Sequence, residues 1–307
     1  MTTAMKKTAI LIGTVLLLTG CFHDMHELRP SEWGGRPVGY IATALSWELA
    51  DDAGTPIHAL TLSPGGAAAS FTKSYSGARD AAKELIQLPA GAYDVLATVN
   101  MTEADGFTLA GLPATRAFPA DVAVSLKNPV SSPAQAWFGV APANVEKDAV
   151  TSVQPQLQRL LCSLSIKVDN VPAGATLVLT LSNVAKSVTL TARDAGGRYG
   201  VPGAESVSDL TLATLTAQSS GPVALEGFTV LPTASAFDRC ILSISVTSAS
   251  GVPLSCVCDA PHMEAGKAYT LNLDYNSLQP YMYLDSYSIS EWESGWTVNG
   301  EILNPDE

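Results

Sequence analysis

The sequence has few charged residues, few histidines and no long apolar segment. Charged side chains make up 15% of its 307 residues, against roughly 25% in an average soluble domain. Only four histidines are present, which leaves little material for a catalytic base or a metal cluster. After the first 20 residues, no stretch approaches the roughly 18 consecutive apolar residues of a transmembrane helix. The composition therefore predicts a body that does not cross a membrane.

Catalytic signatures are also missing. The sequence has neither the G-x-S-x-G turn of a serine hydrolase nor the G-x-x-x-x-G-K-[ST] phosphate loop. His23 and His26 precede Glu27 in an order that is not the H-E-x-x-H zinc motif. Ser70 and Lys73 match S-x-x-K, but the S-D-N and K-T-G partners of that motif are absent. We therefore expect no enzymatic activity, no cofactor and no metal site.

Acidic residues outnumber basic ones. The chain has 29 acidic and 17 basic residues, a net charge of −12. Loss of Lys6 and Lys7 with a signal peptide would leave 15 basic residues and a net charge of −14. Nucleic acid requires a basic face, so we expect no nucleic-acid partner. Attachment to an anionic membrane cannot rest on charge either.

The N-terminus has the pattern of a lipoprotein signal peptide. Lys6 and Lys7 precede the apolar run Ala9–Leu18, which is too short to span a bilayer and is typical of a secretory signal. Leu18-Thr19-Gly20-Cys21 resembles the bacterial lipobox, in which the cysteine is lipidated and becomes the mature N-terminus. An ordinary signal peptide with a chance cysteine is the alternative. Several acyl chains on one residue give stable anchoring, so we predict a membrane tether through palmitate-type lipid on Cys21.

The whole chain divides by composition into five segments. Residues 1–20 are the predicted signal peptide, and residues 21–37, which are polar and interrupted by Pro and Gly, form a tether. Residues 38–152 and 153–280 are predicted as an N-terminal and a C-terminal β-sandwich domain. Residues 281–307 form an alternating tail, which either completes the second domain or contacts a neighbouring subunit.

Alternation with a period of two dominates both predicted domains, and sustained helical periodicity is nearly absent. Many short strands at this spacing predict an all-β fold of two sandwiches in tandem. Residues 78–88 are ambiguous between helix and strand. The predicted strands are Val38–Leu49, Ile57–Leu62, Ala68–Thr72, Ala92–Asn100, Asp121–Leu126, Gln135–Val140, Leu160–Val168, Thr176–Ser182, Ser187–Ala192, Asp209–Thr216, Val223–Leu231, Cys240–Thr247, Leu254–Asp259 and Tyr269–Tyr275.

Four cysteines follow Cys21, at positions 162, 240, 256 and 258. An even number in an exported protein permits disulfides. Each of the four, however, alternates in register with Leu, Ile or Val, as a buried small hydrophobe would. We favour free core thiols. A bond between Cys240 and Cys258, across the hairpin that residues 247–253 close, stays as the alternative.

Two segments resemble each other. "PAGAYDVLATVN" at 89–100 and "EAGKAYTLNLDYN" at 264–276 both have Ala-Gly, a tyrosine, an alternating strand and an asparagine. Either the two domains are duplicates, or two turn–strand units are similar by chance.

Tryptophans are the main candidates for ligand contact. Trp47 and Trp137 fall within apolar strands, where aromatic side chains fill cores. Trp292 and Trp296, in "SEWESGW", are better candidates for surface contact.

Together, the lipobox, "LPAGAYDVLATVN", "AQAWFGVAPANV" and "ISEWESGWTVNGEI" resemble the fimbrial anchor and minor-subunit lipoproteins of the Bacteroidales fimbrillin superfamily. The resemblance implies two transthyretin-like β-sandwiches, a lipid anchor at the outer membrane and the cell surface, and adhesion through a fimbrium whose subunits join by β-strand donation. The sparse acids after Cys21, Asp24 and Glu27, depart from the acidic cluster expected for surface export.

A second function remains open from the sequence. A glycan-binding surface lipoprotein of a polysaccharide-uptake system could use the same sandwiches, with tryptophan faces around a groove. The two functions differ in what the surface should carry. A binder should expose coplanar tryptophans, whereas an anchor should expose an apolar strand edge.

Overall fold

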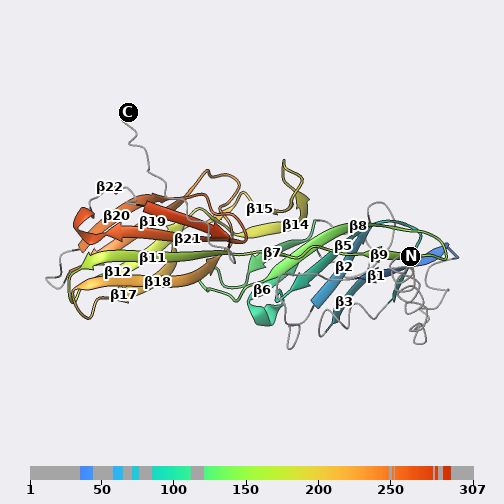
Figure 1. The fold of residues 1–307 in the computed structure, drawn as a ribbon, viewed down its shortest axis with the longest axis horizontal. Helices are drawn as coiled ribbons and strands as arrows, with labels where there is room; N and C mark the ends of the chain where they lie inside the picture. The colour runs from blue at the N-terminus through green and yellow to red at the C-terminus, as the bar shows by residue number, and fades with distance from the viewer. Residues whose placement is uncertain are drawn as a thin grey trace, which may run out of the picture.

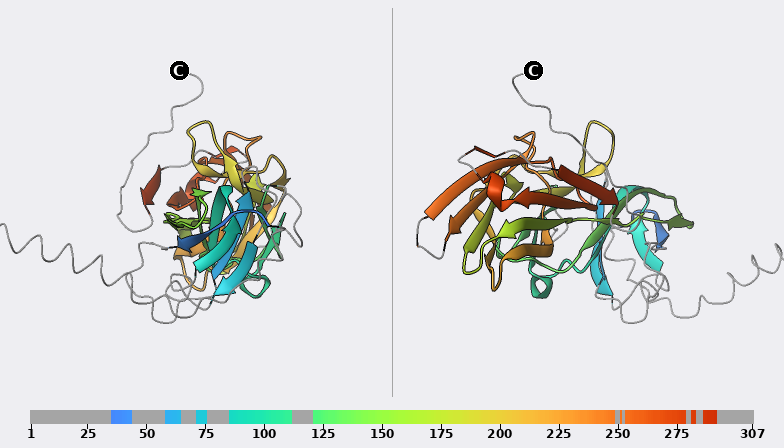
Figure 2. Two further views of the ribbon diagram at one scale, coloured as in Figure 1. Left: turned by 90° about the vertical axis from the view of Figure 1, so that its right-hand side faces the viewer. Right: turned by 60° about the vertical axis from the view of Figure 1, so that its left-hand side comes forward.

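The computed structural model describes residues 35–43, 58–64, 71–75, 85–111, 121–248, 251, 253–278, 281–282 and 286–291. Within these ranges the chain is almost entirely β-strand, with two short 3-10 turns at Glu103–Asp105 and Tyr275–Ser277. Two β-sandwiches lie end to end along the long axis (Figure 1) and overlap when viewed along that axis (Figure 2, left). The predicted all-β fold of tandem sandwiches is confirmed. No helix in the described part is long and apolar enough to cross a membrane.

The first sandwich packs a three-stranded sheet against a five-stranded one. Its core is formed by inward side chains such as Ile41, Leu88, Tyr93 and Val95, each at most 1% exposed. The smaller sheet has the order β4 (Leu85–Pro89), β1 (Val38–Thr43), β9 (Val150–Val153), and the larger has the order β10 (Gln158–Arg159), β8 (Trp137–Val145), β5 (Gly91–Val99), β2 (His58–Pro64), β3 (Phe71–Tyr75).

The second sandwich packs a four-stranded sheet against a five-stranded one. Alternation explains its core, because every second residue of a strand faces the same side. The four-stranded sheet has the order β18 (Gly221–Val230), β11 (Cys162–Val171), β21 (Lys267–Asp274), β23 (Ser286–Glu291), and the five-stranded sheet has the order β17 (Leu210–Thr216), β12 (Thr176–Ser182), β19 (Cys240–Thr247), β20 (Pro253–Ala260), β22 (Tyr281–Met282).

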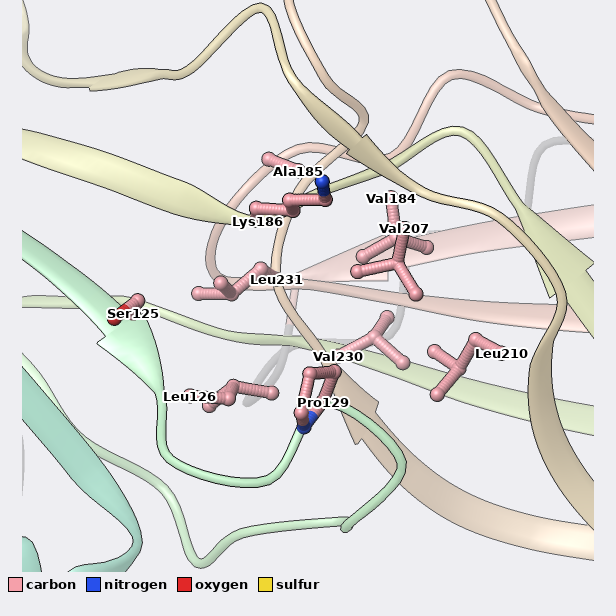
Figure 3. A pocket seen from close by; sticks show the side chains of 10 residues that line it. All are labelled: Ser125, Leu126, Pro129, Val184, Ala185, Lys186, Val207, Leu210, Val230 and Leu231. Atoms are coloured by element: carbon pink, nitrogen blue, oxygen red, sulfur yellow. The ribbon is translucent and has the colours of Figure 1, made fainter.

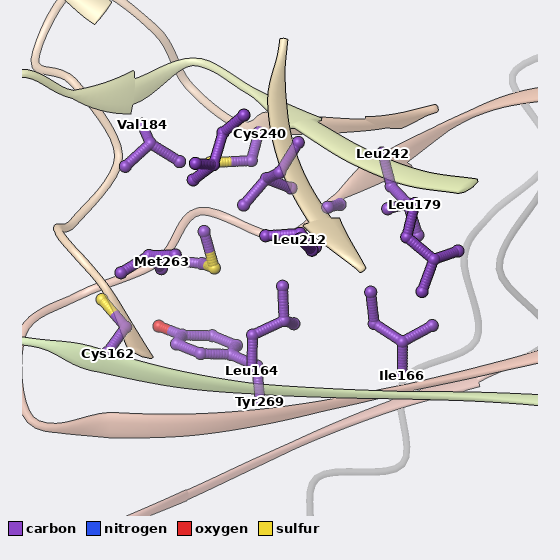
Figure 4. Close-up of a cluster of buried hydrophobic side chains, with 14 of the residues drawn as sticks. Cys162, Leu164, Ile166, Leu179, Val184, Leu212, Cys240, Leu242, Met263 and Tyr269 are labelled. Carbon is purple, nitrogen blue, oxygen red and sulfur yellow. The ribbon is translucent and has the colours of Figure 1, made fainter. Parts of the chain in front are cut away.

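The two central strands supply the middle of this core. On β11, Leu164 and Ile166 are fully buried, and on β12 Leu179 is fully buried. Figure 4 shows these side chains converging with Leu242, Met263 and Tyr269 from the neighbouring elements.

A third sheet joins the two halves. Strands β6 (Phe107–Ala110) and β7 (Ala123–Leu126) pair with β14 (Ser187–Arg193) and β15 (Tyr199–Pro202), in the order β15-β14-β7-β6. A small pair, β13 (Val184–Ala185) and β16 (Ser206–Val207), lies beside it. The joint is tight, since a Cβ on Gly200 of β15 would approach the ring of Phe138 of β8. Strands from both sides of residue 152 therefore share one sheet, and the predicted division at that residue stays a prediction.

Most predicted strands coincide with observed ones. β12 and β19 have the predicted bounds, β14 and β17 differ from prediction by one residue at one end, and β5 and β20 differ by one residue at each end. In the ambiguous region 78–88, the described residues 85–88 belong to strand β4. The predictions missed the short strands β6, β9, β10, β13, β15 and β16. These have two to four residues, too few for alternation to be recognised.

The four described cysteines are free and buried. Cys240 lies opposite Ala260, while Cys258 lies opposite Leu242, so the alternative disulfide is not formed. Burial raises the pKa of Cys258 to about 12 and that of Cys240 to about 11. Because the thiolate is the reactive form, these side chains behave as packing groups.

The two similar segments also have similar structures. Tyr93 of β5 and Tyr269 of β21 are both buried, each in its own sandwich. The Tyr93 hydroxyl donates to the Pro89 carbonyl at 2.8 Å, and the Tyr269 hydroxyl accepts from the Glu264 amide at 2.8 Å. In each case the hydroxyl forms a hydrogen bond with a backbone group four or five residues earlier in the chain, and this bond fixes the turn that precedes or begins the strand. Burial raises the pKa of Tyr93 to about 12, partly offset by the nearby charge of Arg36.

This shift predicts a loss of stability in alkali. Between about pH 10 and 12 the unfolded chain releases the Tyr93 proton while the folded chain keeps it, so the free energy of unfolding falls as pH rises. Tyr93→Phe should lower the free energy of unfolding by about 1 kcal/mol at pH 8, because the hydrogen bond is lost. The variant has no hydroxyl at position 93 to titrate, so it should not show this further loss of stability in alkali. Urea titrations at pH 8 and pH 11 should show the gap between the two proteins closing. A gap that stays constant would contradict the role given to Tyr93.

Candidate strand-docking site

The second sandwich has two flanks, and the chain's own tail covers one of them. β23 pairs antiparallel with β21, from Lys267 opposite Glu291 to Asn272 opposite Ser286. β22 pairs with β20 at the corresponding edge of the other sheet. Tyr287 and Ile289 of β23 are half-buried and pack against the core. Of the two roles predicted for the tail, its described part therefore has the intramolecular one.

The opposite flank is formed by β17 and β18, one from each sheet. They are connected through residues 217–220, and within the described ranges no strand pairs with the outer edge of either. Edge strands present unpaired backbone N–H and C=O groups that can pair with another chain. Figure 1 places both strands along the lower side of the left-hand lobe.

β18 has features that hinder pairing. Pro222 and Glu226 lie on it, and a register irregularity follows Leu225, where Gly227 adopts φ +61°. Near its end, the Thr229 amide donates to Ser132 Oγ at 2.9 Å. Proline, charge and bulges are the devices that protect natural edge strands. We therefore regard β18 as a protected edge.

β17 shares one of these devices, a register irregularity between Thr211 and Ala213, but it lacks the other two. Its sequence, "LTLATLT", has no charged residue and no proline. Among the edge strands of the described chain, it is the longest with neither. Its outward residues are the exposed threonines Thr211, Thr214 and Thr216. An uncharged, β-prone free edge is the kind that pairs readily with a further strand.

The space between the two edge strands is lined by half-buried apolar side chains. Leu215 of β17 faces inward, as do Val223, Leu225 and Phe228 of β18. All four pack against the core without being fully covered, whereas Leu164 and Leu177 on the central strands are 0% exposed. A strand added at β17 could bury the parts of these four side chains that are still exposed.

An apolar groove of about 230 Å³ lies at one end of this flank. Leu210, the first residue of β17, and Val230, the last of β18, both line it (Figure 3). Further lining comes from Leu231 and from the joint between the halves, including Leu126 and Val184. Lys186 is the only charged residue among the lining groups.

A second, more polar cleft of about 380 Å³ lies at the joint, beside β15. Arg198 Nε is 2.9 Å from Asp194 Oδ2, and Arg198 Nη1 is 3.8 Å from Glu264 Oε2. Hydrogen bonds from Arg198 hold the pKa of Asp194 below its usual value. The carboxylates here already pair with protein groups, and the described residues contain no cluster that could hold a metal ion.

The site residues predicted from sequence fall largely outside this region. Cys21, Trp292 and Trp296 lie outside the described residues, as does Trp47. Trp137 is half-buried, with the Arg159 guanidinium 5.6 Å from its ring centroid. Trp137 is the only tryptophan among the described residues, and the free strand edge that they show is the uncharged edge of β17. The sequence predicted β17 as a strand, but nothing in it indicated that β17 would be a sheet edge.

Comparison with solved structures shows similar folds. A Bacteroides thetaiotaomicron protein proposed to bind polysaccharide has a TM-score of 0.52 at 10% identity, over 87% of this chain and 99% of that one. The fimbrial anchor protein Mfa2 from Porphyromonas gingivalis has a TM-score of 0.49 at 11% identity, over 84% and 98%. A proposed adhesin from Bacteroides ovatus has a TM-score of 0.48 at 12% identity, over 73% and 83%. At these identities the likeness concerns the fold alone.

Sequence comparison is more specific. No curated protein matches the chain. A family model does match it across residues 57–253, which is more than half of its length and includes parts of both sandwiches and the whole sheet that joins them. The resemblance inferred from the short motifs is confirmed, and the chain belongs to the family of fimbrillin-A associated anchor proteins Mfa1 and Mfa2.

Proposed function

We propose that this protein is an outer-membrane lipoprotein that serves as the structural anchor, or a minor subunit, of a surface fimbria. Family membership supports the anchor or adhesin role. The lipid on Cys21 would hold one end at the membrane. A fibre subunit would be held at the other end by β-strand complementation, and no catalytic step is involved.

One observation carries this proposal, namely the free, uncharged edge of β17 on a flank that the chain's own tail leaves uncovered. Backbone hydrogen bonds along such an edge supply affinity, and alternate side chains supply register. The added strand would cover Leu215 and the half-buried side chains of β18.

The position of the edge also suits an anchor. β1, the first described strand, lies in the right-hand lobe of Figure 1, and β17 lies in the left-hand lobe. The tether, residues 21–37, leads into β1. The strand that follows the tether in sequence and the proposed fibre attachment are in different lobes, which supports an anchor whose two ends have separate roles.

Leu215→Lys is expected to abolish fibre attachment. In the free protein the lysine stem can lie along the flank with its ammonium group in water, so the domain stays folded. An added strand would have to cover this charge, which opposes strand addition. In the bacterium that makes the protein, electron microscopy should show fibres lost from the cells and an immunoblot should recover them from the medium.

Ser245→Lys is the matched control. It adds the same charge to an exposed position on β19, in the centre of the same sheet, and should leave cell-bound fibres at wild-type number. A folded Leu215→Lys protein that still holds fibres would contradict the proposal. Tight binding of an oligosaccharide by the intact protein, with fibres unaffected by either variant, would favour the glycan-binding alternative.

A further inference from the structure

The apolar groove beside β17 has a chemistry that specifies the incoming strand. We propose that it receives one bulky aliphatic side chain from the strand that adds to β17, and that Lys186 at its rim pairs with a carboxylate carried by the same segment. This inference rests on the proposed function and adds to it the register and the chemistry of the partner.

Position is the first argument. The groove is lined by Leu210 at the start of β17 and Val230 at the end of β18, the two strands that bound the open flank. A segment that follows the free edge of β17 reaches the groove as it passes Leu210. In strand-addition complexes, such pockets at the edge select side chains and fix the register.

Size is the second argument. At about 230 Å³, the groove is smaller than the roughly 300–1,000 Å³ of typical small-molecule sites. It is large enough for a side chain, and its floor consists of residues that are at most 2% exposed, such as Val184, Val230 and Leu231. A leucine- or isoleucine-sized group therefore suits it better than a free ligand.

Charge is the third argument. Lys186 is the single charged group that lines the groove, in a chain whose net charge is −12. Its ammonium nitrogen is 3.5 Å from Glu205 Oε2, and both side chains are exposed. Exposed ion pairs of this kind are weak, so Lys186 can interact with another carboxylate. An acidic residue next to the aliphatic one would be complementary to this rim.

Synthetic peptides test the inference on the full mature protein. The reference peptide alternates threonine and valine and ends in leucine followed by glutamate. A second peptide replaces leucine with glycine, and a third replaces glutamate with glutamine. All three are also made with the reversed sequence, because the strand could add in either direction. Dissociation constants are measured by calorimetry, with circular dichroism and thermal melting to verify folding.

Two groove variants accompany the peptides. Val207→Phe fills the mouth of the groove from half-buried strand β16, and Val207→Leu replaces it if the larger ring impairs folding. Lys186→Gln removes the charge. We expect leucine to bind about tenfold more tightly than glycine, Val207→Phe to erase that difference, and Lys186→Gln to erase the preference for glutamate over glutamine.

The edge variant separates this inference from the proposed function. Leu215→Lys should abolish binding of every peptide, and Ser245→Lys should not change it. If leucine and glycine peptides bind the wild type equally while Leu215→Lys abolishes binding, the edge docks strands and the groove inference is wrong. Equal binding of the glutamate and glutamine peptides would overturn the role of Lys186. If no peptide binds the wild type, both the inference and the proposed edge are contradicted.

Discussion

Cys21→Ala is expected to move nearly all of the protein from the membrane fraction to the soluble fraction. The replacement removes the only thiol in the lipobox, and with it the proposed site of acylation. Each buried CH₂ of an acyl chain contributes ~0.8 kcal/mol to anchoring. The described residues include no helix that is long and apolar enough to cross a membrane. The net charge of −12 also disfavours an anionic surface.

The measurement is fractionation followed by detergent phase partition and immunoblotting. Cys162→Ala is the control, because Cys162 is fully buried in the second sandwich and should leave partition unchanged. If Cys21→Ala enters the detergent phase as the parent does, the lipid tether is wrong and the anchor loses its attachment to the membrane.

Deleting residues 281–307 is expected to destabilise the second sandwich strongly. The deletion removes β22 and β23, exposes the edge of β21, and uncovers the surface against which Tyr287 and Ile289 pack. Two half-buried side chains of this size contribute about 1 kcal/mol each, and the lost ladder adds to this. At about 2–4 °C per kcal/mol for a chain of this size, we expect the melting temperature to fall by about 4–10 °C.

A shorter truncation is the control. Removing only residues 292–307 keeps both tail strands and should leave the melting temperature unchanged. It also deletes Trp292 and Trp296, the tryptophans that the sequence marked for surface contact. Because we place attachment at β17, cells with this truncation should keep their fibres. An unchanged melting temperature after the longer deletion would mean that the tail strands do not stabilise the domain.

Local strand pattern was the part of the fold that could be predicted. Thr176–Ser182 was predicted with correct bounds because Leu177, Leu179 and Leu181 alternate with polar or outward residues and all point into the core. β15 was missed because four residues that include Gly200 and Pro202 carry little alternation. Alternation reports which face of a strand is buried, and it is weak in strands this short.

Pairing between distant segments could not be predicted. The joint depends on Ala123–Ser125 pairing with Ser187–Thr189, and no local pattern specifies a partner some 60 residues away. The candidate site could not be predicted for the same reason, because the position of a strand within a sheet depends on its pairing with distant segments. "LTLATLT" reads as a strand whether it lies in the middle of a sheet or at its edge, and only the assembled topology shows that one side of β17 is free among the described strands.

Amide hydrogen exchange of the protein, free and bound to its fibre, tests the central claim most directly. Backbone groups of β17 that face solvent in the free protein should become hydrogen-bonded when a strand is added. We predict that exchange slows at residues 210–216 on fibre binding, while the already paired β12 changes little. Protection that appears at another edge, such as β9 or β15, with β17 exchanging as in the free protein, would contradict the account.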